Sequence, residues 1–276
     1  MNSPFKTRIA PTPSGFLHQG NLLNFLLIQS LKEKTGASIH LRIDDGDQAR
    51  VRDEYIEDIF QSLKWLKMNP DSGPSSLEDF KRNHSQRTRD ELYKNALGEL
   101  RNQPGLIYSC ECSRKKIQDE GVNLNGIILY NGTCRELHHH YSLGTHNLKI
   151  NTCRAEQRLQ NELGDFVIWK KEGEAAYQLS SLVDDLYYDI NFVIRGEDLS
   201  PSTLAQRFLK NFLAPEKTIH FYHHPLLKVN GEKISKSQGN SGWSKIYEQK
   251  KTLKELKAEL NFAEYEKSLD NFLRTL

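Results

Sequence analysis

Residues 11–21 read PTPSGFLHQGN and stand between an apolar segment at residues 5–10 and a leucine-rich segment at residues 18–34. Proline, serine and glycine at the start of this stretch are typical of a turn. Leucines at helical spacing predict a helix over residues 18–34, with Gly36 as its natural end. We therefore expect a strand, a loop and a helix in that order. In a parallel α/β sheet ligands bind at such a loop, and the helix N-terminus favours a phosphate group.

The segments outward from this loop predict an α/β fold with a parallel sheet. A second strand is expected at 38–43 and a second helix at 53–68, and this alternation is typical of parallel sheets. Periodicity weakens at 102–165 and returns at 176–183, before a strand at 192–195, a helix at 201–212, a strand at 218–222 and a helical tail from 243. We expect two halves of one domain at 1–101 and 176–225, an insertion at 102–175, and a loop with a helical region at 226–276.

The composition narrows the class of protein. Hydrophobic residues make up 37% of the 276 residues and charged residues 27%, a mix typical of a soluble globular protein. The net charge of +2 excludes a strongly basic protein that coats nucleic acid. No apolar run approaches the roughly 18–20 residues of a membrane span, and the first residues do not resemble a secretory signal. With four cysteines, these features predict a cytoplasmic protein whose cysteines are thiols or metal ligands.

Two loops carry residues suited to a nucleotide. His18 can donate a hydrogen bond to a phosphate oxygen, and Gly20 allows close approach to the backbone. Residues 233–237 read KISKS, and Lys233 and Lys236 could neutralise charge on a departing pyrophosphate. The alternatives are an ordinary loop with a surface histidine and a solvated basic loop.

The two loops and two further segments together resemble class I aminoacyl-tRNA synthetases. The loop at 11–21 is similar to their "HIGH" signature, and residues 233–237 are similar to their "KMSKS" loop, with isoleucine in place of methionine. The stretches LRIDD at 41–45 and VIRGEDL at 193–199 resemble two segments of glutamyl-tRNA synthetases. The resemblance runs from about residue 5 to 240 in the same order, and it implies a Rossmann-like parallel-sheet catalytic domain.

This resemblance implies a two-step reaction. Glutamate and ATP, which carries Mg²⁺, give glutamyl-adenylate and pyrophosphate, and the glutamyl group then moves to a hydroxyl of tRNA. Such chemistry needs alignment and charge stabilisation, with no covalent nucleophile. The implied catalytic residues are His18, Lys233 and Lys236. The implied ATP contacts are His18, Gly20, Asn21 and Lys236.

The resemblance also implies a glutamate pocket. Arginine pairs bidentately with carboxylate, which suits the positions of Arg8 and Arg195; the alternative is that both form surface salt bridges. Asp44 stands where the family has a glutamate that meets the substrate amino group, so its reach is one methylene shorter. The implied glutamate contacts are Arg8, Ile9, Ala10, Pro11, Thr12, Asp44, Tyr177 and Arg195.

The cysteines of the insertion have the spacing of a metal site. Cys110 and Cys112 form a C-x-C pair, and Cys134 follows 22 positions after Cys112. Spacing alone leaves five candidates for the fourth ligand: Tyr130, His138, His139, His140 and Cys153. The Y-x-x-x-C arrangement after C-x-C resembles glutamyl-queuosine tRNA(Asp) synthetases, in which a tyrosine completes a structural zinc site. This implies Tyr130 first and one of the histidines second; the alternatives are unrelated thiols or a site that has lost its metal.

The expected RNA partner is tRNA(Asp) that carries queuosine. The sequence ends soon after the KISKS loop, whereas full-length glutamyl-tRNA synthetases continue into a helical domain that reads the anticodon. The short form with its cysteine-bearing insertion resembles the queuosine enzymes, and a monomer is the expectation for that family. The complete KISKS loop is closer to the full-length enzymes. The alternatives are a truncated glutamyl-tRNA synthetase that acylates the 3′ end of tRNA(Glu), a small-molecule ligase that forms an acyl-adenylate, and a noncatalytic paralogue.

Overall fold

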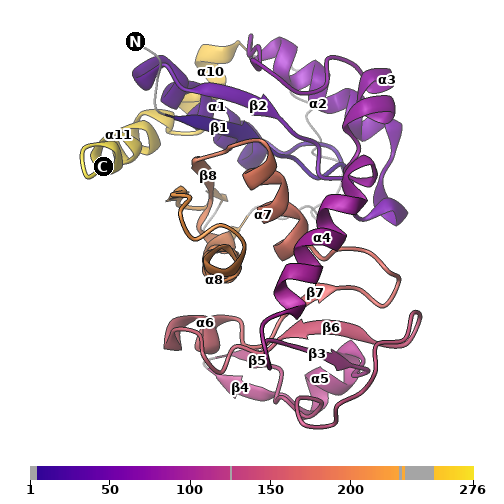
Figure 1. Ribbon diagram of the computed structural model, residues 1–276. Coiled ribbons are helices and arrows are strands. Elements are labelled where there is room, and N and C mark those ends of the chain that lie inside the picture. Colours follow the sequence, from indigo (N-terminus) through magenta and orange to yellow (C-terminus); the bar gives the residue numbers. More distant parts are fainter. Residues whose placement is uncertain (1–4, 125, 230–231, 234–251) are drawn as a thin grey trace. The chain divides into compact units, whose positions relative to one another are not determined.

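The computed structural model describes residues 5–124, 126–229, 232–233 and 252–276. The chain forms two compact units (Figure 1). The first consists of Met1–Thr88, Tyr188–Leu199 and Thr218–Leu276, and the second consists of Arg89–Tyr187 and Ser200–Lys217. This grouping begins the second unit earlier than the insertion expected at 102–175 and adds a later segment to it. The expected domain boundaries stay a prediction.

The first unit contains parallel strands, which confirms the predicted α/β class. Strand β1 (Lys6–Ile9) pairs in parallel with β2 (Ser38–Leu41), and β8 (Phe192–Gly196) pairs in parallel with β9 (His220–His224). The carbonyl of Lys6 accepts a hydrogen bond of 3.0 Å from the N–H of Asn191, which places β8 beside β1. The loops that follow β1, β2 and β8 therefore leave the sheet at the carboxyl ends of its strands.

Two helices cover the early strands. Helix α1 (Gln19–Thr35) ends at Gly36, whose φ of 72° is the left-handed conformation that glycine adopts without strain. Helix α2 (Asp53–Trp65) buries one side, including Ile56 and Ile59. It ends before the expected position at residue 68 because Lys67 has a φ of 56°, outside the helical region.

The C-terminal helices complete the first unit. Helix α10 (Leu253–Glu259) begins at a capping box of Thr252 and Glu255, and helix α11 (Phe262–Leu273) packs against α1 and β9. The buried core joins these helices to the sheet through Leu256 and Leu269, which are fully buried. The unit also contains shorter elements: η1 (Gln48–Arg50), α3 (Leu77–Asp79), η2 (Phe80–His84), η4 (Glu197–Leu199), β10 (Lys228–Val229) and β11 (Glu232–Lys233).

The second unit combines an antiparallel sheet with a group of helices. The sheet has the order β3 (Ile107–Cys110), β6 (Asn147–Ile150) and β7 (Val167–Trp169), and β4 (Val122–Leu124) pairs with β5 (Ile127–Leu129). The helices are α4 (Asp90–Arg101), α5 (Arg114–Glu120), α6 (Gln157–Glu162), α7 (Tyr177–Tyr187) and α8 (Ser200–Leu213). The short helix η3 (Gln86–Arg89) spans the boundary between the two units in the chain.

A buried ion pair ties the helices of the second unit together. Arg89 donates from Nε and Nη2 to the two oxygens of Asp184 at 2.7 and 3.1 Å, and the hydroxyl of Tyr93 donates to the same carboxylate at 2.8 Å. Removing one partner of such a pair costs about 3–5 kcal/mol because the other charge stays buried. Within the described residues, none of the helices is both long enough and apolar enough to cross a membrane.

Candidate active site and metal centre

The loop at residues 11–18 is held at both ends by the first unit. The N–H of Arg42 donates to the carbonyl of Ile9 at 2.8 Å, and the N–H of Asp44 donates to the carbonyl of Pro11 at 2.9 Å. At the far end, the N–H of Leu17 donates to Oδ2 of Asp58, a buried residue of α2. Burial raises the pKa of Asp58 above its ordinary value, although the Leu17 hydrogen bond opposes this. No local sequence pattern indicates that Asp58 supports this loop.

His18 caps helix α1 in a way that fixes its ring. Its Nδ1 accepts a hydrogen bond of 3.1 Å from the N–H of Gly20, and its own N–H donates to Oδ1 of Asn21 at 3.0 Å. Because Nδ1 is an acceptor, the neutral ring carries its proton on Nε2. The three residues predicted to contact ATP in this loop therefore meet at one helix N-terminus, where Nε2–H is a donor suited to a phosphate oxygen.

The structure brings the two predicted arginines to neighbouring strands. Arg8 on β1 and Arg195 on β8 are each 4% exposed, so neither is a surface residue. Nη1 of Arg8 donates to the carbonyl of Ile194 at 3.4 Å, next to Arg195 in the chain. The guanidinium of Arg195 lies over the ring of Phe221, 5.0 Å from its centroid. Two buried cations on the adjacent strands β1 and β8 can bind a substrate with two carboxylates.

The backbone that follows β1 belongs to the same edge of the sheet. Ile9 and Pro11 are buried, while Ala10 and Thr12 are partly exposed. Asp44, which follows β2, is also buried and forms a bidentate pair with Arg42 at 2.7 and 3.1 Å. This pairing fixes the orientation of the Asp44 carboxylate, and the sequence did not predict it.

A second pair of residues at this edge was not predicted from the sequence. The amide of Asn24 in α1 donates to the carbonyl of Ile194 at 3.1 Å and lies 3.3 Å from Nε2 of His224. Nδ1 of His224 lies 2.9 Å from the carbonyl of Pro225, which fixes Nδ1 as the protonated nitrogen. Burial lowers the pKa of His224 and keeps its ring neutral, so Asn24 donates to Nε2.

Three further predicted residues belong to other elements or lie outside the described residues. Tyr177 begins α7 in the second unit, where it is 39% exposed. Lys233 ends the short strand β11, and Lys236 lies outside the described residues. The roles of these three residues stay predictions.

The three cysteines of the predicted metal site come together in the second unit. Cys110, Cys112 and Cys134 are buried, and their Sγ atoms all lie within 4.8 Å of one another. The hydroxyl of Tyr130 lies 3.4 Å from Sγ of Cys110 and 3.6 Å from Sγ of Cys112, and it accepts the N–H of Cys134 at 2.9 Å. Three thiols and one phenol oxygen are thus grouped as a four-coordinate site requires.

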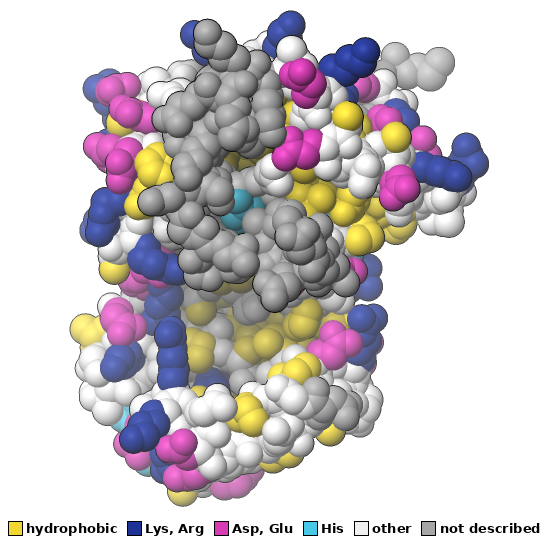
Figure 2. All heavy atoms as spheres, turned by 180° about the vertical axis from the view of Figure 1, so that it is seen from behind, with side chains coloured by type: hydrophobic (Ala, Val, Ile, Leu, Met, Phe, Trp, Pro, Cys, Tyr) yellow, Lys and Arg dark blue, Asp and Glu magenta, His cyan; other side chains and the backbone are white. Residues whose placement is uncertain are grey.

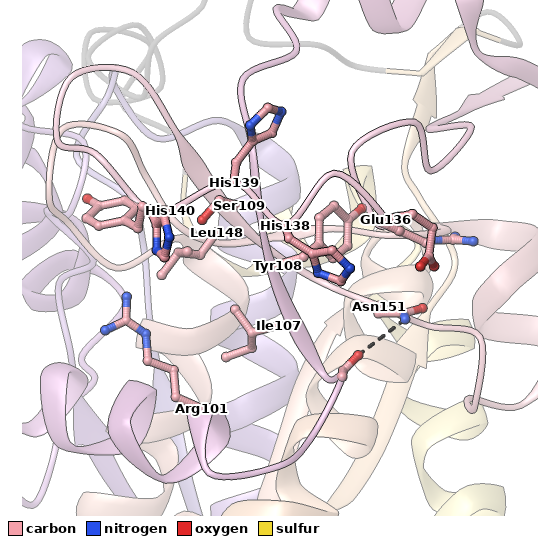
Figure 3. A pocket seen from close by; sticks show the side chains of 13 residues that line it. Arg101, Ile107, Tyr108, Ser109, Glu136, His138, His139, His140, Leu148 and Asn151 are labelled. Carbon is pink, nitrogen blue, oxygen red and sulfur yellow. Dashed lines mark hydrogen bonds between the residues drawn. The ribbon is translucent and has the colours of Figure 1, made fainter.

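The other candidates for a fourth ligand are not part of this group. Among the described residues, the cluster of possible metal-binding side chains is formed by the three cysteines alone. His138, His139 and His140 line a cavity of about 550 Å³ together with Arg101 and Tyr141 (Figure 3). The fourth thiol of the chain, Cys153, is exposed.

The thiols of this cluster have pKa values that a metal ion would change. Burial raises the pKa of Cys110 to about 11, so without a cation this thiol stays protonated at neutral pH. Burial also raises the pKa of Cys134, but hydrogen bonds from Tyr130 and Cys112 outweigh it and lower the value overall. A zinc ion would stabilise all three thiolates, and the donor set fits zinc by type and grouping.

The visible surface does not form one basic face. Figure 2 shows Lys and Arg side chains interspersed with Asp and Glu side chains on the side it displays. This distribution agrees with the net charge of +2. Local contacts, rather than a large positive field, would have to recognise an RNA on this face.

Comparisons with known proteins agree with this geometry. The family model "tRNA synthetases class I (E and Q), catalytic domain" matches residues 4–157 and 145–261. Glutamyl-Q tRNA(Asp) synthetase of Prochlorococcus marinus (strain MIT 9313) is 33% identical over 242 residues, which cover 87% of this chain and 76% of the relative. The protein of that name from Burkholderia cenocepacia (strain HI2424) is 34% identical over 256 residues, with 87% and 82% covered.

Solved structures share the fold. A glutamate tRNA ligase from Elizabethkingia meningosepticum has a TM-score of 0.65 at 20% identity, covering 85% of this chain and 52% of that one. Mycobacterium tuberculosis methionyl-tRNA synthetase in complex with methionyl-adenylate has a TM-score of 0.59 at 13% identity, covering 90% and 62%. This chain thus spans about half the length of the first of these structures. The chain is an aminoacyl-tRNA synthetase-like ligase and belongs to the class I tRNA synthetase family of the E and Q type.

Proposed function

We propose that this enzyme activates L-glutamate with ATP and transfers the glutamyl group to the queuosine base of tRNA(Asp). The observation that supports the chemistry is the pair of buried arginines, Arg8 and Arg195, on neighbouring strands of the unit whose helix α1 has an N-terminus suited to a phosphate group. The acceptor is inferred from the relatives, which are named glutamyl-Q tRNA(Asp) synthetase.

In the first step, a carboxylate oxygen of glutamate attacks the α-phosphorus of ATP, and pyrophosphate leaves. The Nε2–H of His18 donates to a phosphate oxygen, and Gly20 and Asn21 present the start of α1 to the nucleotide. Lys233 and Lys236 neutralise the charge that grows on the departing pyrophosphate, and Mg²⁺ enters the site with ATP. No residue of the chain forms a covalent bond with the substrate.

Glutamate is selected by fixed charge. Arg8 and Arg195 bind its carboxylates, and Asp44, held by Arg42, accepts from its amino group. Asp44 reaches one methylene less far toward the amino group than the family's glutamate does, and the backbone at Ile9, Ala10, Pro11 and Thr12 lines the same pocket. Tyr177 is the remaining proposed contact.

Zinc is proposed to have a structural role in the second unit. Cys110, Cys112, Cys134 and Tyr130 would hold it, because these residues supply the cluster of donor atoms described above. A bound ion would cross-link β3 to the loop that follows β5, in a region of short elements.

In the second step, a hydroxyl of the queuosine cyclopentenediol attacks the carbonyl carbon of glutamyl-adenylate, and AMP leaves. A wobble base can be splayed out of an anticodon loop, as single-stranded bases usually are when proteins bind them. Because phosphate contacts contribute to RNA affinity, acylation should weaken as salt rises. We further propose that the enzyme works in the cytoplasm as a monomer.

The decisive experiment is acylation of purified tRNA(Asp) with labelled glutamate. The matched control is the same tRNA with guanosine in place of queuosine. We expect label on the queuosine form alone, and nuclease digestion should release that label on the queuosine nucleotide of the anticodon and not on the 3′-terminal adenosine. Label at the 3′ end of tRNA(Glu) would identify an ordinary glutamyl-tRNA synthetase activity instead. Absence of glutamate-dependent pyrophosphate exchange would indicate a noncatalytic paralogue.

A further inference from the structure

A buried lysine lies beside the cysteine cluster, and the zinc assignment does not explain it. Lys149 is 5% exposed, whereas lysines are almost never buried without a partner. In the ladder between β3 and β6 it stands opposite Tyr108. Alternation along β3 places Tyr108 and Cys110 on the same face of the sheet, so Lys149 belongs to the face that carries the cluster.

The ammonium group of Lys149 is directed at Tyr130. Its Nζ lies 4.1 Å from the centroid of the Tyr130 ring, and it donates to the backbone carbonyl of Asp165 at 3.3 Å. The hydroxyl of the same ring lies beside the thiols of Cys110 and Cys112. One side chain is therefore in contact with the lysine through its ring and with the cluster through its oxygen.

The carboxylate of Asp165, whose backbone carbonyl Lys149 contacts, has hydrogen-bond donors on both of its oxygens. Oδ2 of Asp165 accepts from the hydroxyl of Tyr108 and from Nε of Arg135, each at 2.6 Å. Oδ1 of Asp165 accepts from the N–H and the hydroxyl of Thr152, each at 2.9 Å. The Asp165 carboxylate is also paired with Arg135, so its charge is compensated without Lys149, whose charge also interacts with Cys110, Cys112 and Cys134.

A zinc site of this composition needs a positive neighbour. Three thiolates and a phenolate around a doubly charged ion leave two uncompensated negative charges in a buried place, which is costly. We infer that Lys149 supplies the counter-charge that allows Tyr130 to serve as the fourth zinc ligand. This inference rests on the zinc site of the proposed function. Lys149 is a positioning residue here, because it acts on the metal through Tyr130.

The test compares zinc affinities of purified variants by competition with a chelator. Lys149→Met keeps the length of the side chain and removes its charge, and Lys149→Arg keeps the charge. The control is Lys171→Met, the same change at an exposed lysine of the same unit. We expect Lys149→Met to bind zinc about 10- to 100-fold more weakly, the usual effect of losing an outer-shell partner. Lys149→Arg should recover most of the affinity, and the control should equal the parent.

Two further measurements separate charge compensation from packing. Zinc added to the metal-free parent should produce the ultraviolet difference spectrum of a deprotonated tyrosine, and Lys149→Met should reduce it. In a Tyr130→Phe background, Lys149→Met should cost little further affinity. If Lys149→Met does not fold, Lys149→Gln takes its place in both comparisons.

Three results would contradict this inference in distinguishable ways. Equal zinc affinity in the parent and the folded, uncharged variant would overturn the role of Lys149 and leave the zinc site standing. An equal loss in the Tyr130→Phe background would show that Lys149 does not act through Tyr130. A parent protein that binds no zinc would overturn the site and this inference together, while glutamate-dependent pyrophosphate exchange would still report separately on the proposed activity.

Discussion

The N–H of Leu17 donates a hydrogen bond of 2.8 Å to the buried carboxylate of Asp58. Leu17 directly precedes His18, and Asp58 lies in the middle of α2. The contact therefore fixes the end of the loop where the predicted nucleotide contacts begin. Burial disfavours the ionised form of this carboxylate and thereby raises the pKa of Asp58.

We expect two substitutions of Asp58 to behave differently. Asp58→Ala leaves the Leu17 N–H without its acceptor and should lower the free energy of unfolding by about 1–3 kcal/mol. Asp58→Asn keeps an acceptor and removes the buried charge, so it should be less harmful. Denaturant titration measures both. Glu57→Gln, at an exposed position of the same helix, should stay within about 0.5 kcal/mol of the parent.

The raised pKa of Asp58 also predicts a pH dependence. A carboxyl group whose pKa is higher in the folded state than its ordinary 3.8 contributes stability below 3.8 and loses it as pH rises through the folded value. The stability of the parent relative to Asp58→Asn should therefore fall as pH rises across this window. A relative stability that rises with pH would contradict the assignment.

The paired arginines should be needed for glutamate activation. Arg8→Ala or Arg195→Ala removes one charge-assisted bidentate contact, which should cost about 2–4 kcal/mol of substrate or transition-state binding. Glutamate-dependent pyrophosphate exchange measures this, and circular dichroism checks that each variant is folded. Arg82→Ala, at an exposed position of the first unit, is the control. Normal exchange in either test variant would reject the assignment.

The fold was predictable where its signals are local. The strands and helices around residues 5–65 follow from apolar runs, periodicity and Gly36, and the structure has them within a few residues. Helix α4 was not predicted, although Tyr93, Ala96, Leu97 and Leu100 stand at helical spacing and are buried. This helical spacing of apolar residues is visible in the sequence, so helix α4 was predictable.

The supporting contacts were not predictable because they join distant residues. Asp58 lies 41 positions from Leu17, and Asn24 lies 200 positions from His224. No local pattern relates such pairs before the sheet brings them together. Lys149 illustrates a different limit, because a lysine in a strand is normally expected to face solvent.

The zinc site should depend on its ligands in a graded way. Cys110→Ser and Cys134→Ser remove a thiolate and should abolish tight binding, whereas Tyr130→Phe should weaken it. Elemental analysis of freshly purified protein should find one zinc per chain in the parent. The control is Cys153→Ser, which changes the exposed thiol outside the cluster and should keep the metal.

Two results would contradict the zinc site. Protein without any metal after purification in the absence of chelators would reject it. Unchanged zinc affinity in Tyr130→Phe would move the fourth ligand away from the phenol oxygen, towards the histidines at 138–140.

The last prediction concerns Gly20 and the ring of His18. A Cβ atom at Gly20 would lie 3.0 Å from Cε1 and Nδ1 of His18, so the ring must move to accommodate it. Alanine is also the better helix former by about 0.5–1 kcal/mol. We therefore expect Gly20→Ala to keep or raise the free energy of unfolding while kcat/KM for ATP in pyrophosphate exchange falls about 10- to 100-fold, as misplaced catalytic groups cause. Gly98→Ala in α4 is the matched control, because a Cβ there meets nothing within 4 Å. It should gain similar stability without losing exchange. Full exchange activity in Gly20→Ala would show that the position of the His18 ring does not govern the use of ATP.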